Sequence, residues 1–152
     1  MSVQERLASL GLALPSVVPP VASYVPAVRS GNLVFTAGQI PLVDGSLAFS
    51  GRVGETVTPE QAQQLAQVCA LNALAAITTV ADLDSIVRMV KVVGFVASAP
   101  EFFGQPMVVN GASDLLKAVF GDHGAHARSA VGVVSLPLNA PVEVELVVEV
   151  SG

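Results

Sequence analysis

At 152 residues, the chain has the length of one ordinary domain and can bury a core without disulfide staples. Its formal net charge is −5, from 7 Lys and Arg against 12 Asp and Glu, with no basic cluster. A nucleic-acid backbone requires concentrated positive charge, so this balance argues against such a partner. Hydrophobic residues make up 52% of the chain, which predicts a tightly packed domain with apolar surface to bury in an oligomer.

The single cysteine, Cys69, cannot form an internal disulfide, which is typical of a cytoplasmic protein. The sequence has neither the pattern of a secretory signal nor an apolar run that could span a bilayer. We therefore expect a cytoplasmic protein that does not associate with a membrane.

The N-terminal region is predicted to hold one short helix. Ser2-Val3-Gln4-Glu5 has the spacing of a capping box, and Gly11 is suited to ending a helix, so the helix is expected over residues 3–10. The Pro-rich stretch from Pro15 to Pro26 cannot continue it.

Two strands are expected next, over residues 22–28 and 32–37, joined by a turn at Arg29-Ser30-Gly31. Thr58-Pro59-Glu60-Gln61 then supplies an N-cap, a proline at the first helical position and a capping glutamine. This motif predicts a long helix up to about Thr79. The buried stripe of that helix is expected to include Leu65, Cys69, Asn72 and Ala76, with Asn72 as a hydrogen-bonded core amide.

The second half of the chain is predicted to contain a long third strand over residues 85–98. Asn110 is suited to capping a second long helix, and Gly121 to ending it. Apolar residues alternate over 128–137 and again from Val142, so each segment is predicted to be a strand with one buried face. The order β-β-α-β-α-β-β predicts one α+β domain, with a single sheet and both long helices on one of its faces.

Arg128 opens one of these last two strands and Glu143 opens the other. If the two strands are adjacent, the cation and the carboxylate lie at matching ends and could form a small-molecule site. The residue types are equally compatible with an Arg128–Glu143 ion pair that has no chemical role.

The motifs also resemble those of a known family. The similar segments are Gly31 to Pro41, Asn110, Ala127-Arg128-Ser129 and the path through Leu136-Pro137 to Val142-Glu143-Val144-Glu145. In this order and spacing they are similar to the Rid, or YjgF-like, family of reactive-intermediate enamine/imine deaminases, and to a subgroup often labelled endoribonuclease L-PSP or RidA-family protein.

The resemblance covers about residues 24–150, and it divides the chain into two parts. Residues 1–21 form an N-terminal helix with a Pro-rich extension, and residues 22–152 form the Rid-like domain. The resemblance implies a chorismate-mutase-like fold assembled as a homotrimer, with ligand sites in the clefts between subunits.

The resemblance also implies two catalytic residues. Arg128 would hold the carboxylate of a 2-imino or 2-enamino acid, because a planar guanidinium fits a carboxylate with two parallel hydrogen bonds. Glu143 would orient or activate the water that attacks the imine carbon. Loss of ammonia leaves a 2-keto acid, and neither metal nor organic cofactor is needed because the imine is already electrophilic. Glu143 could instead be a solvated strand residue, since Glu145 and Glu149 share its face by alternation.

Five further residues are expected at the substrate on the same grounds: Tyr24, Ala37, Gly38, Asn110 and Ala130. Tyr24 could also be a packing residue, Gly38 would permit close backbone approach, and Asn110 would reach the cleft of the neighbouring subunit. Ala37 and Ala130 replace a serine and a cysteine that well-known members carry. Both replacements remove a polar group from the presumed cleft and enlarge it.

The favoured function is therefore hydrolytic deamination of small enamino and imino acids. A non-catalytic trimer that binds a small carboxylate is the alternative, in which Glu143 would be expendable. An endoribonuclease ranks last because the chain is acidic. His123 and His126 flank the turn before Arg128, and their role is left open.

Overall fold

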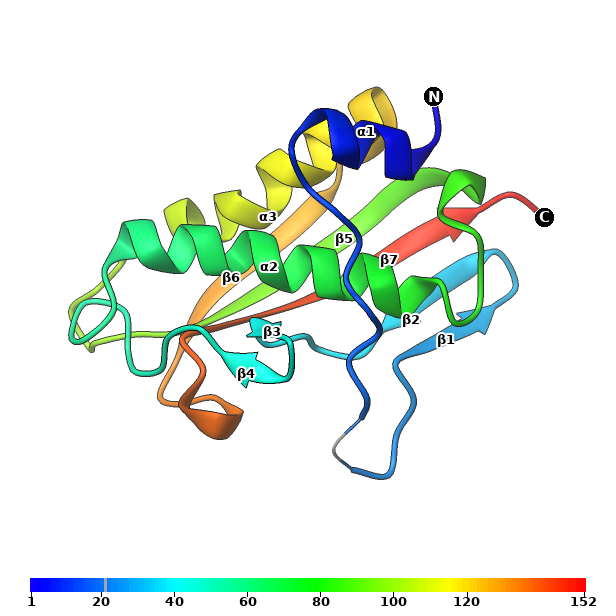
Figure 1. Cartoon of the computed structure of the whole chain (residues 1–152). Coiled ribbons are helices and arrows are strands. Elements are labelled where there is room, and N and C mark those ends of the chain that lie inside the picture. Colours follow the sequence, from blue (N-terminus) through cyan, green and yellow to red (C-terminus); the bar gives the residue numbers. More distant parts are fainter. Residues whose placement is uncertain (21) are drawn as a thin grey trace.

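The computed structural model describes residues 1–20 and 22–152. Two long helices, α2 (Pro59–Ile77) and α3 (Gln105–Phe120), pack against each other on one face of a five-stranded sheet (Figure 1). This arrangement confirms the predicted α+β fold with both long helices on one face. Along the described residues, no helix combines the length and apolarity needed to cross a membrane.

The five strands follow the order β1-β2-β7-β5-β6 across the sheet. Their bounds are Ala27–Ser30 (β1), Leu33–Thr36 (β2), Val142–Val150 (β7), Ile86–Ala97 (β5) and Ala127–Val133 (β6). Neighbouring strands are antiparallel except for β5 and β6, which run parallel.

The placement of β5 between β6 and β7 overturns one sequence-based expectation. Arg128 and Glu143 do not lie at matching ends of adjacent strands, because the chain leaves the edge strand β6 and re-enters the sheet on the far side of β5. Consecutive strands need not pair when a longer buried strand can form a ladder with both of them.

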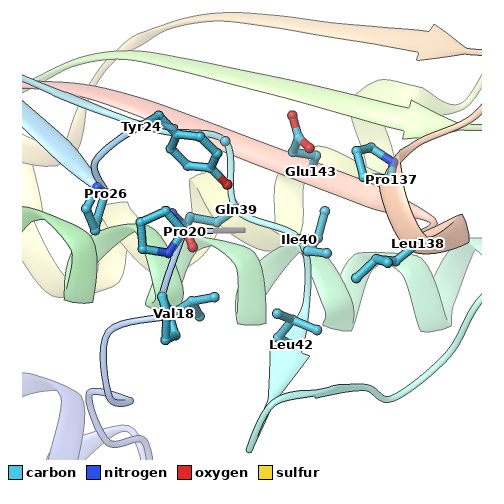
Figure 2. A pocket seen from close by; sticks show the side chains of 12 residues that line it. Val18, Pro20, Tyr24, Pro26, Gln39, Ile40, Leu42, Pro137, Leu138 and Glu143 are labelled. Carbon is cyan, nitrogen blue, oxygen red and sulfur yellow. The ribbon is translucent and has the colours of Figure 1, made fainter. Parts of the chain in front are cut away.

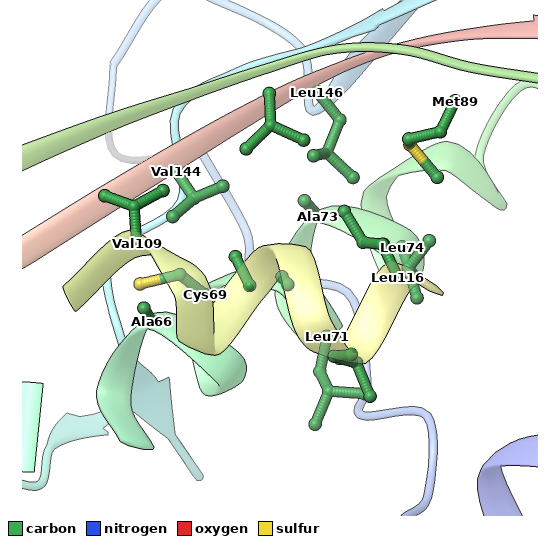
Figure 3. Close-up of a cluster of buried hydrophobic side chains, with 14 of the residues drawn as sticks. Ala66, Cys69, Leu71, Ala73, Leu74, Met89, Val109, Leu116, Val144 and Leu146 are labelled. Atoms are coloured by element: carbon green, nitrogen blue, oxygen red, sulfur yellow. The ribbon is translucent and has the colours of Figure 1, made fainter. Parts of the chain in front are cut away.

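The core lies between the sheet and the two long helices. Figure 3 shows α2 contributing Ala66 and Cys69, α3 contributing Val109 and Leu116, and the sheet contributing Val144. Small side chains on α2 allow this helix to approach the sheet closely. All members of the stripe predicted for α2 are buried, namely Leu65, Cys69, Asn72 and Ala76.

The predicted first strand, over residues 22–28, is wrong in its position. β1 begins only at Ala27, because Pro26 lacks an N–H for a ladder and the Tyr24 N–H donates to the Ala22 carbonyl in a local turn at 2.9 Å. The following hairpin closes with the two residues Gly31 and Asn32, and Gly31 adopts the positive φ of 62° that such a turn requires.

The helix caps were predicted with mixed success. Thr58 forms a full capping box with Gln61, and Gly121 ends α3, as expected. Asn110 is not an N-cap, because α3 already begins at Gln105, with Pro106 in its first turn. Asn110 instead lies in the second turn, where its side chain is available for tertiary contacts.

A second, two-stranded sheet was not predicted. It consists of β3 (Leu42–Val43) and β4 (Ser46–Leu47), joined by Asp44 and Gly45 with φ values of 51° and 84°. Asp-Gly between apolar residues is a known hairpin signal, so the sequence did carry the information.

The predicted N-terminal helix is confirmed as α1 (Val3–Ser9), capped by Ser2 and Glu5. It packs beside α3, where Leu7 is fully buried and the Arg6 guanidinium donates to the Val119 carbonyl at 2.8 Å. From α1 the chain runs across α2 towards β1 (Figure 1). The domain boundary predicted at residues 21 and 22 falls on residue 21, which lies outside the described residues.

Candidate functional site

A cavity of about 190 Å³ opens beside the start of β7 (Figure 2). It is lined by the segment before β1 (Val18, Pro19, Pro20, Tyr24, Pro26), the loop after β2 (Gly38, Gln39, Ile40, Leu42), the turn before β7 (Pro137, Leu138) and Glu143. Glu143 is the only carboxylate among these lining residues. Three residues predicted at the site, namely Tyr24, Gly38 and Glu143, therefore meet in one largely apolar pocket.

The environment of Glu143 disfavours its charged form. Burial raises the pKa of this carboxyl, and the nearby carboxylate of Glu145 raises it further. The fully buried Cys69 thiol, whose Sγ donates to the Val142 carbonyl at 3.7 Å, also has a raised pKa, mainly through burial and then through Glu143. Glu143 is thus suited to taking up and releasing a proton closer to neutral pH than an ordinary carboxylate.

Gly38 provides the space that the Glu143 carboxylate occupies. A Cβ at this position would lie 2.5 Å from Oε2 of Glu143, closer than any real contact. The group that lies close to the Gly38 backbone is therefore the Glu143 side chain on β7, and the role of Gly38 at a substrate stays a prediction.

The loop that forms one wall of the pocket is held by backbone hydrogen bonds at Gln39 and by the side-chain amide of Asn72. The Gln39 N–H donates to the Val144 carbonyl at 2.9 Å, and the Val144 N–H returns a bond to the Gln39 carbonyl at 3.0 Å. From α2, Asn72 Nδ2 donates to the carbonyls of Ile40 at 3.1 Å and Leu42 at 3.0 Å. The prediction of Asn72 as a hydrogen-bonded core amide is confirmed, and this amide fixes the backbone of the wall.

Arg128, on β6, belongs to a second group of polar residues, which it forms with residues of α3. Its Nη1 donates to Asn110 Oδ1 at 2.7 Å and to Ser113 Oγ at 3.2 Å, and its Nη2 donates to the Pro106 carbonyl at 3.3 Å. These bonds use three of the five N–H donors of a guanidinium, so two remain for a ligand.

His126 extends this group through Ser113. The His126 Nδ1 lies 2.7 Å from the Gly124 carbonyl, which can only accept, so Nδ1 carries a proton. In the neutral ring, Nε2 then accepts from the Ser113 hydroxyl at 2.8 Å, and Ser113 Oγ accepts from Arg128. His123 is exposed and lies outside this chain of hydrogen bonds.

The two groups do not meet within one chain. Arg128 lies opposite the buried Val92 of β5, on the face covered by the helices, and its guanidinium turns towards α3. Glu143 lies opposite Phe95 of β5 and alternates with buried valines, so it leaves the sheet on the open face. This geometry excludes an Arg128–Glu143 ion pair within the chain.

The remaining two predicted residues lie beside these groups. Ala37 directly precedes Gly38, donates its N–H to the Pro26 carbonyl at 2.8 Å and does not line the cavity. Ala130 lies on the edge strand β6, opposite Gly94, and packs partly against the core. An edge strand carries backbone N–H and C=O groups without a partner strand, so this edge can present backbone groups to a ligand.

Sequence reasoning missed Ser113 and the lining residues at 18–20 and 138. Ser113 follows Asn110 by three residues on a helix, which places both on one face and was a usable signal. Leu138 adopts a left-handed φ of 58°, and no local sequence motif predicts this conformation.

The open face of the sheet carries apolar side chains from several strands. Val28, Phe35 and Val131 are 51%, 43% and 44% exposed, and their partners in the ladder place them on the face opposite the helices. A sheet face of this composition is normally covered by another layer of protein.

Comparisons with known proteins agree with the motifs. A family model described as "YjgF/chorismate_mutase-like, putative endoribonuclease" matches residues 4–150, further towards the N-terminus than the motifs alone reached. Protein TCP17 of Trypanosoma cruzi is 41% identical over 151 residues, covering 98% of this chain and 94% of that protein. The crystal structure of Atu1372, a protein of unknown function from Agrobacterium tumefaciens, is 45% identical with a TM-score of 0.90, covering 98% and 92% of the two chains.

A more distant match is the crystal structure of E. coli TdcF with bound serine, which is 25% identical with a TM-score of 0.59 and covers 90% of this chain and 93% of that chain. The family model and the relatives span nearly the whole chain, the N-terminal helix included. The chain therefore belongs to the YjgF-like, or Rid, family that its motifs indicated.

Proposed function

We propose that this protein hydrolyses reactive 2-enamino and 2-imino acids to 2-keto acids and ammonia, in the cytoplasm, at a site between subunits of a homotrimer. The observation that carries the proposal is the presence of two complementary groups in one chain. A carboxyl group with a raised pKa lies in an apolar pocket, and a guanidinium is fixed elsewhere with donors to spare.

Arg128 is suited to holding the substrate carboxylate. Its bonds to Asn110, Ser113 and Pro106 fix the plane of the guanidinium before a ligand arrives. A ligand carboxylate that accepts the remaining donors would be oriented at little further entropic loss. Serine bound to E. coli TdcF is a small 2-amino acid, which supports this class of ligand for the fold.

Glu143 is suited to moving the protons of the reaction. As a carboxylate it accepts a proton from water while the water oxygen attacks C2 of the protonated imine, and the C=N electron pair moves to nitrogen to give a neutral tetrahedral carbinolamine. The protonated Glu143 then donates its proton to the amine nitrogen, the C–N bond breaks and ammonia leaves. The hydroxyl becomes the keto oxygen as its proton passes to the Glu143 carboxylate, which releases that proton to solvent before the next turnover. The pKa raised by burial supports both steps, because a group that exchanges protons works best when its pKa lies near the operating pH.

The positions of these two groups support the proposed assembly. Since they leave opposite faces of the sheet, one substrate can contact both only if they come from different copies. The apolar open face offers the surface for such an assembly, and the family resemblance points to a ring of three.

The test is keto-acid formation from freshly generated 2-iminobutanoate and 2-aminoacrylate. We expect Arg128→Ala and Glu143→Gln to fall to the uncatalysed rate while both variants fold and assemble. Catalysis that survives in Glu143→Gln would remove the proposed acid/base role of Glu143, whereas a wild-type protein that binds the acids without hydrolysing them would be a carboxylate-binding trimer.

Mixing the two inactive variants tests the site between subunits. If trimers form at random from equal amounts, about one quarter of the interfaces join an intact Glu143 to an intact Arg128, and about that share of activity returns. A mixture that stays inactive after subunit exchange would place both residues of a site in one copy.

A carboxylate-binding trimer is the second candidate, and the serine bound to E. coli TdcF favours it equally. It predicts that Arg128→Ala abolishes ligand binding while Glu143→Gln has no effect on it. The endoribonuclease in the family description ranks below both, because the net charge of −5 opposes binding to RNA.

A further inference from the structure

The pocket around Glu143 has a wall that the family motifs do not account for. Val18, Pro19 and Pro20, here called the Pro-rich wall, lie before β1 and close the cavity on one side. Ile40, Leu42 and Leu138 bring apolar side chains from other segments (Figure 2). Among the described lining residues, Gln39 and Tyr24 are the two that carry polar side chains besides Glu143.

We propose that this pocket binds the side chain of the substrate and selects large apolar groups, branched or aromatic, with the Pro-rich wall as the element that determines this specificity. The inference rests on the proposed function and names its substrate class. It predicts that imino acids derived from leucine or phenylalanine are better substrates than those derived from alanine.

The size of the pocket supports a bulky group. Its volume is about 190 Å³, and an apolar protein cavity of about 150 Å³ is known to bind benzene. A methyl or methylene group would leave most of this space to water against apolar walls. Each further methylene that fills it should raise kcat/KM about fourfold.

The segment that leads to the Pro-rich wall is attached to the core on its N-terminal side. On the N-terminal side, the buried Leu7 and the Arg6 bond to Val119 attach α1 to the core. On the C-terminal side the chain enters β1 at Ala27. The consecutive prolines at positions 19 and 20 restrict the local backbone, which favours a wall that needs little ordering when a ligand binds.

Leu138 faces the Pro-rich wall from the turn before β7 (Figure 2). Its φ of 58° is unfavourable for a residue with a Cβ, and the neighbouring Asn139 has a φ of 60°. The Gly51 N–H donates to the Asn139 carbonyl at 2.9 Å and holds this turn. An apolar side chain kept at the pocket by an unfavourable backbone is consistent with a role in binding.

The experiment compares kcat/KM for imino acids generated in situ from alanine, 2-aminobutanoate, leucine and phenylalanine by an amino-acid oxidase. We expect the wild-type value to rise at least tenfold from the first to the last. In Val18→Phe, which fills the pocket, the two large substrates should lose at least tenfold and the alanine-derived one less than threefold.

Val17→Phe is the matched control, because Val17 is the neighbouring valine and does not line the cavity. It should leave the order of substrates unchanged. Val18→Asn serves as a second variant should Val18→Phe fail to fold, and it should weaken the preference for large substrates by making the wall polar. A wild-type preference for the alanine-derived substrate, or an equal loss for all substrates in both Val18 variants, would overturn the inference while the deaminase function stands.

If no imino acid of any size is hydrolysed, the proposed function fails, and a binding measurement then decides the inference by itself. We expect 3-phenylpropanoate to bind wild-type protein at least tenfold more tightly than propanoate, with NMR shifts at the Ile40 and Leu42 methyl groups. Equal binding of the two acids would show that the pocket does not select apolar groups.

Discussion

The pocket at Glu143 and the hydrogen-bonded group at Arg128 hold charged side chains in opposite ways. Glu143 lies among apolar residues that raise its pKa, whereas three acceptors of α3 surround the Arg128 guanidinium. Burial among apolar side chains makes the charge of the Glu143 carboxylate easier to lose, whereas the acceptors on α3 fix the orientation of the Arg128 guanidinium. The first environment suits a proton carrier and the second suits an anchor for an anion.

Among the four predictions that follow, the largest effect is expected for a substitution of Arg128 that keeps its positive charge. Arg128→Lys should lower kcat/KM about 100-fold, because an ammonium cannot satisfy the acceptors on α3 and a ligand carboxylate together. Steady-state kinetics on 2-iminobutanoate measure the effect, with the exposed Arg88→Lys as the control. If the Arg128→Lys variant keeps more than half of the activity, charge alone suffices.

The next largest effect is expected at Gly38, which leaves space for the Glu143 carboxylate. Gly38→Ala should lower kcat about tenfold, because the new Cβ displaces the Glu143 carboxylate from its position. A double-mutant cycle with Glu143→Asp supplies the control, because the shorter carboxylate leaves room for the new Cβ: in that background Gly38→Ala should cause a smaller further loss than in wild type. Additive losses would assign the effect of Gly38 to the backbone and not to Glu143.

A smaller effect is expected for Ser113, which accepts a hydrogen bond from Arg128. Ser113→Ala should raise KM about fivefold and leave kcat unchanged, because it removes one support of Arg128 and its link to His126. Asp114→Asn, at the exposed neighbouring position, should change neither constant. A fall in kcat at constant KM would mean that Ser113 acts on the reaction and not on the orientation of Arg128.

The smallest effect is on stability and depends on pH. Glu143 has a higher pKa in the folded protein than its ordinary value of 4.5. Between the two pKa values the folded state holds more protons than the unfolded chain, so the free energy of unfolding falls as pH rises through that window. Glu143→Gln removes this loss and should be more stable than wild type at pH 7, by less than about 1 kcal/mol because the side chain is half-exposed.

Urea unfolding at several pH values between 4 and 8 measures this difference. It should shrink as pH falls and vanish below the ordinary carboxylate pKa. A difference that is independent of pH would assign it to packing of the amide and not to the charge of Glu143.

Local motifs predicted the fold well wherever neighbouring residues decide the structure. The capping box at Thr58 and the glycine at 121 fix the ends of helices through bonds within a few residues. The first strand was predicted from residue 22 but begins at Ala27, because Pro26 has no N–H to donate to a neighbouring strand. The position of β5 between β6 and β7 depends on pairing between distant segments, which no local pattern encodes.

In the candidate site, too, local motifs predicted some parts and could not predict others. The contact between Arg128 and Asn110 and the closeness of Gly38 to Glu143 join residues that the motifs had already selected. The Pro-rich wall could not be found in this way, because its place beside Glu143 follows from the packing of α1 on α3.

The two bonds from Asn72 have a consequence for how this protein can diversify. They hold the backbone at Ile40 and Leu42 from the helix behind, without using either side chain. Exchange of those side chains therefore changes the lining of the cavity while its framework stays intact. New ligand preferences can arise here by single substitutions that leave folding almost untouched, which makes this loop a natural starting point for directed evolution.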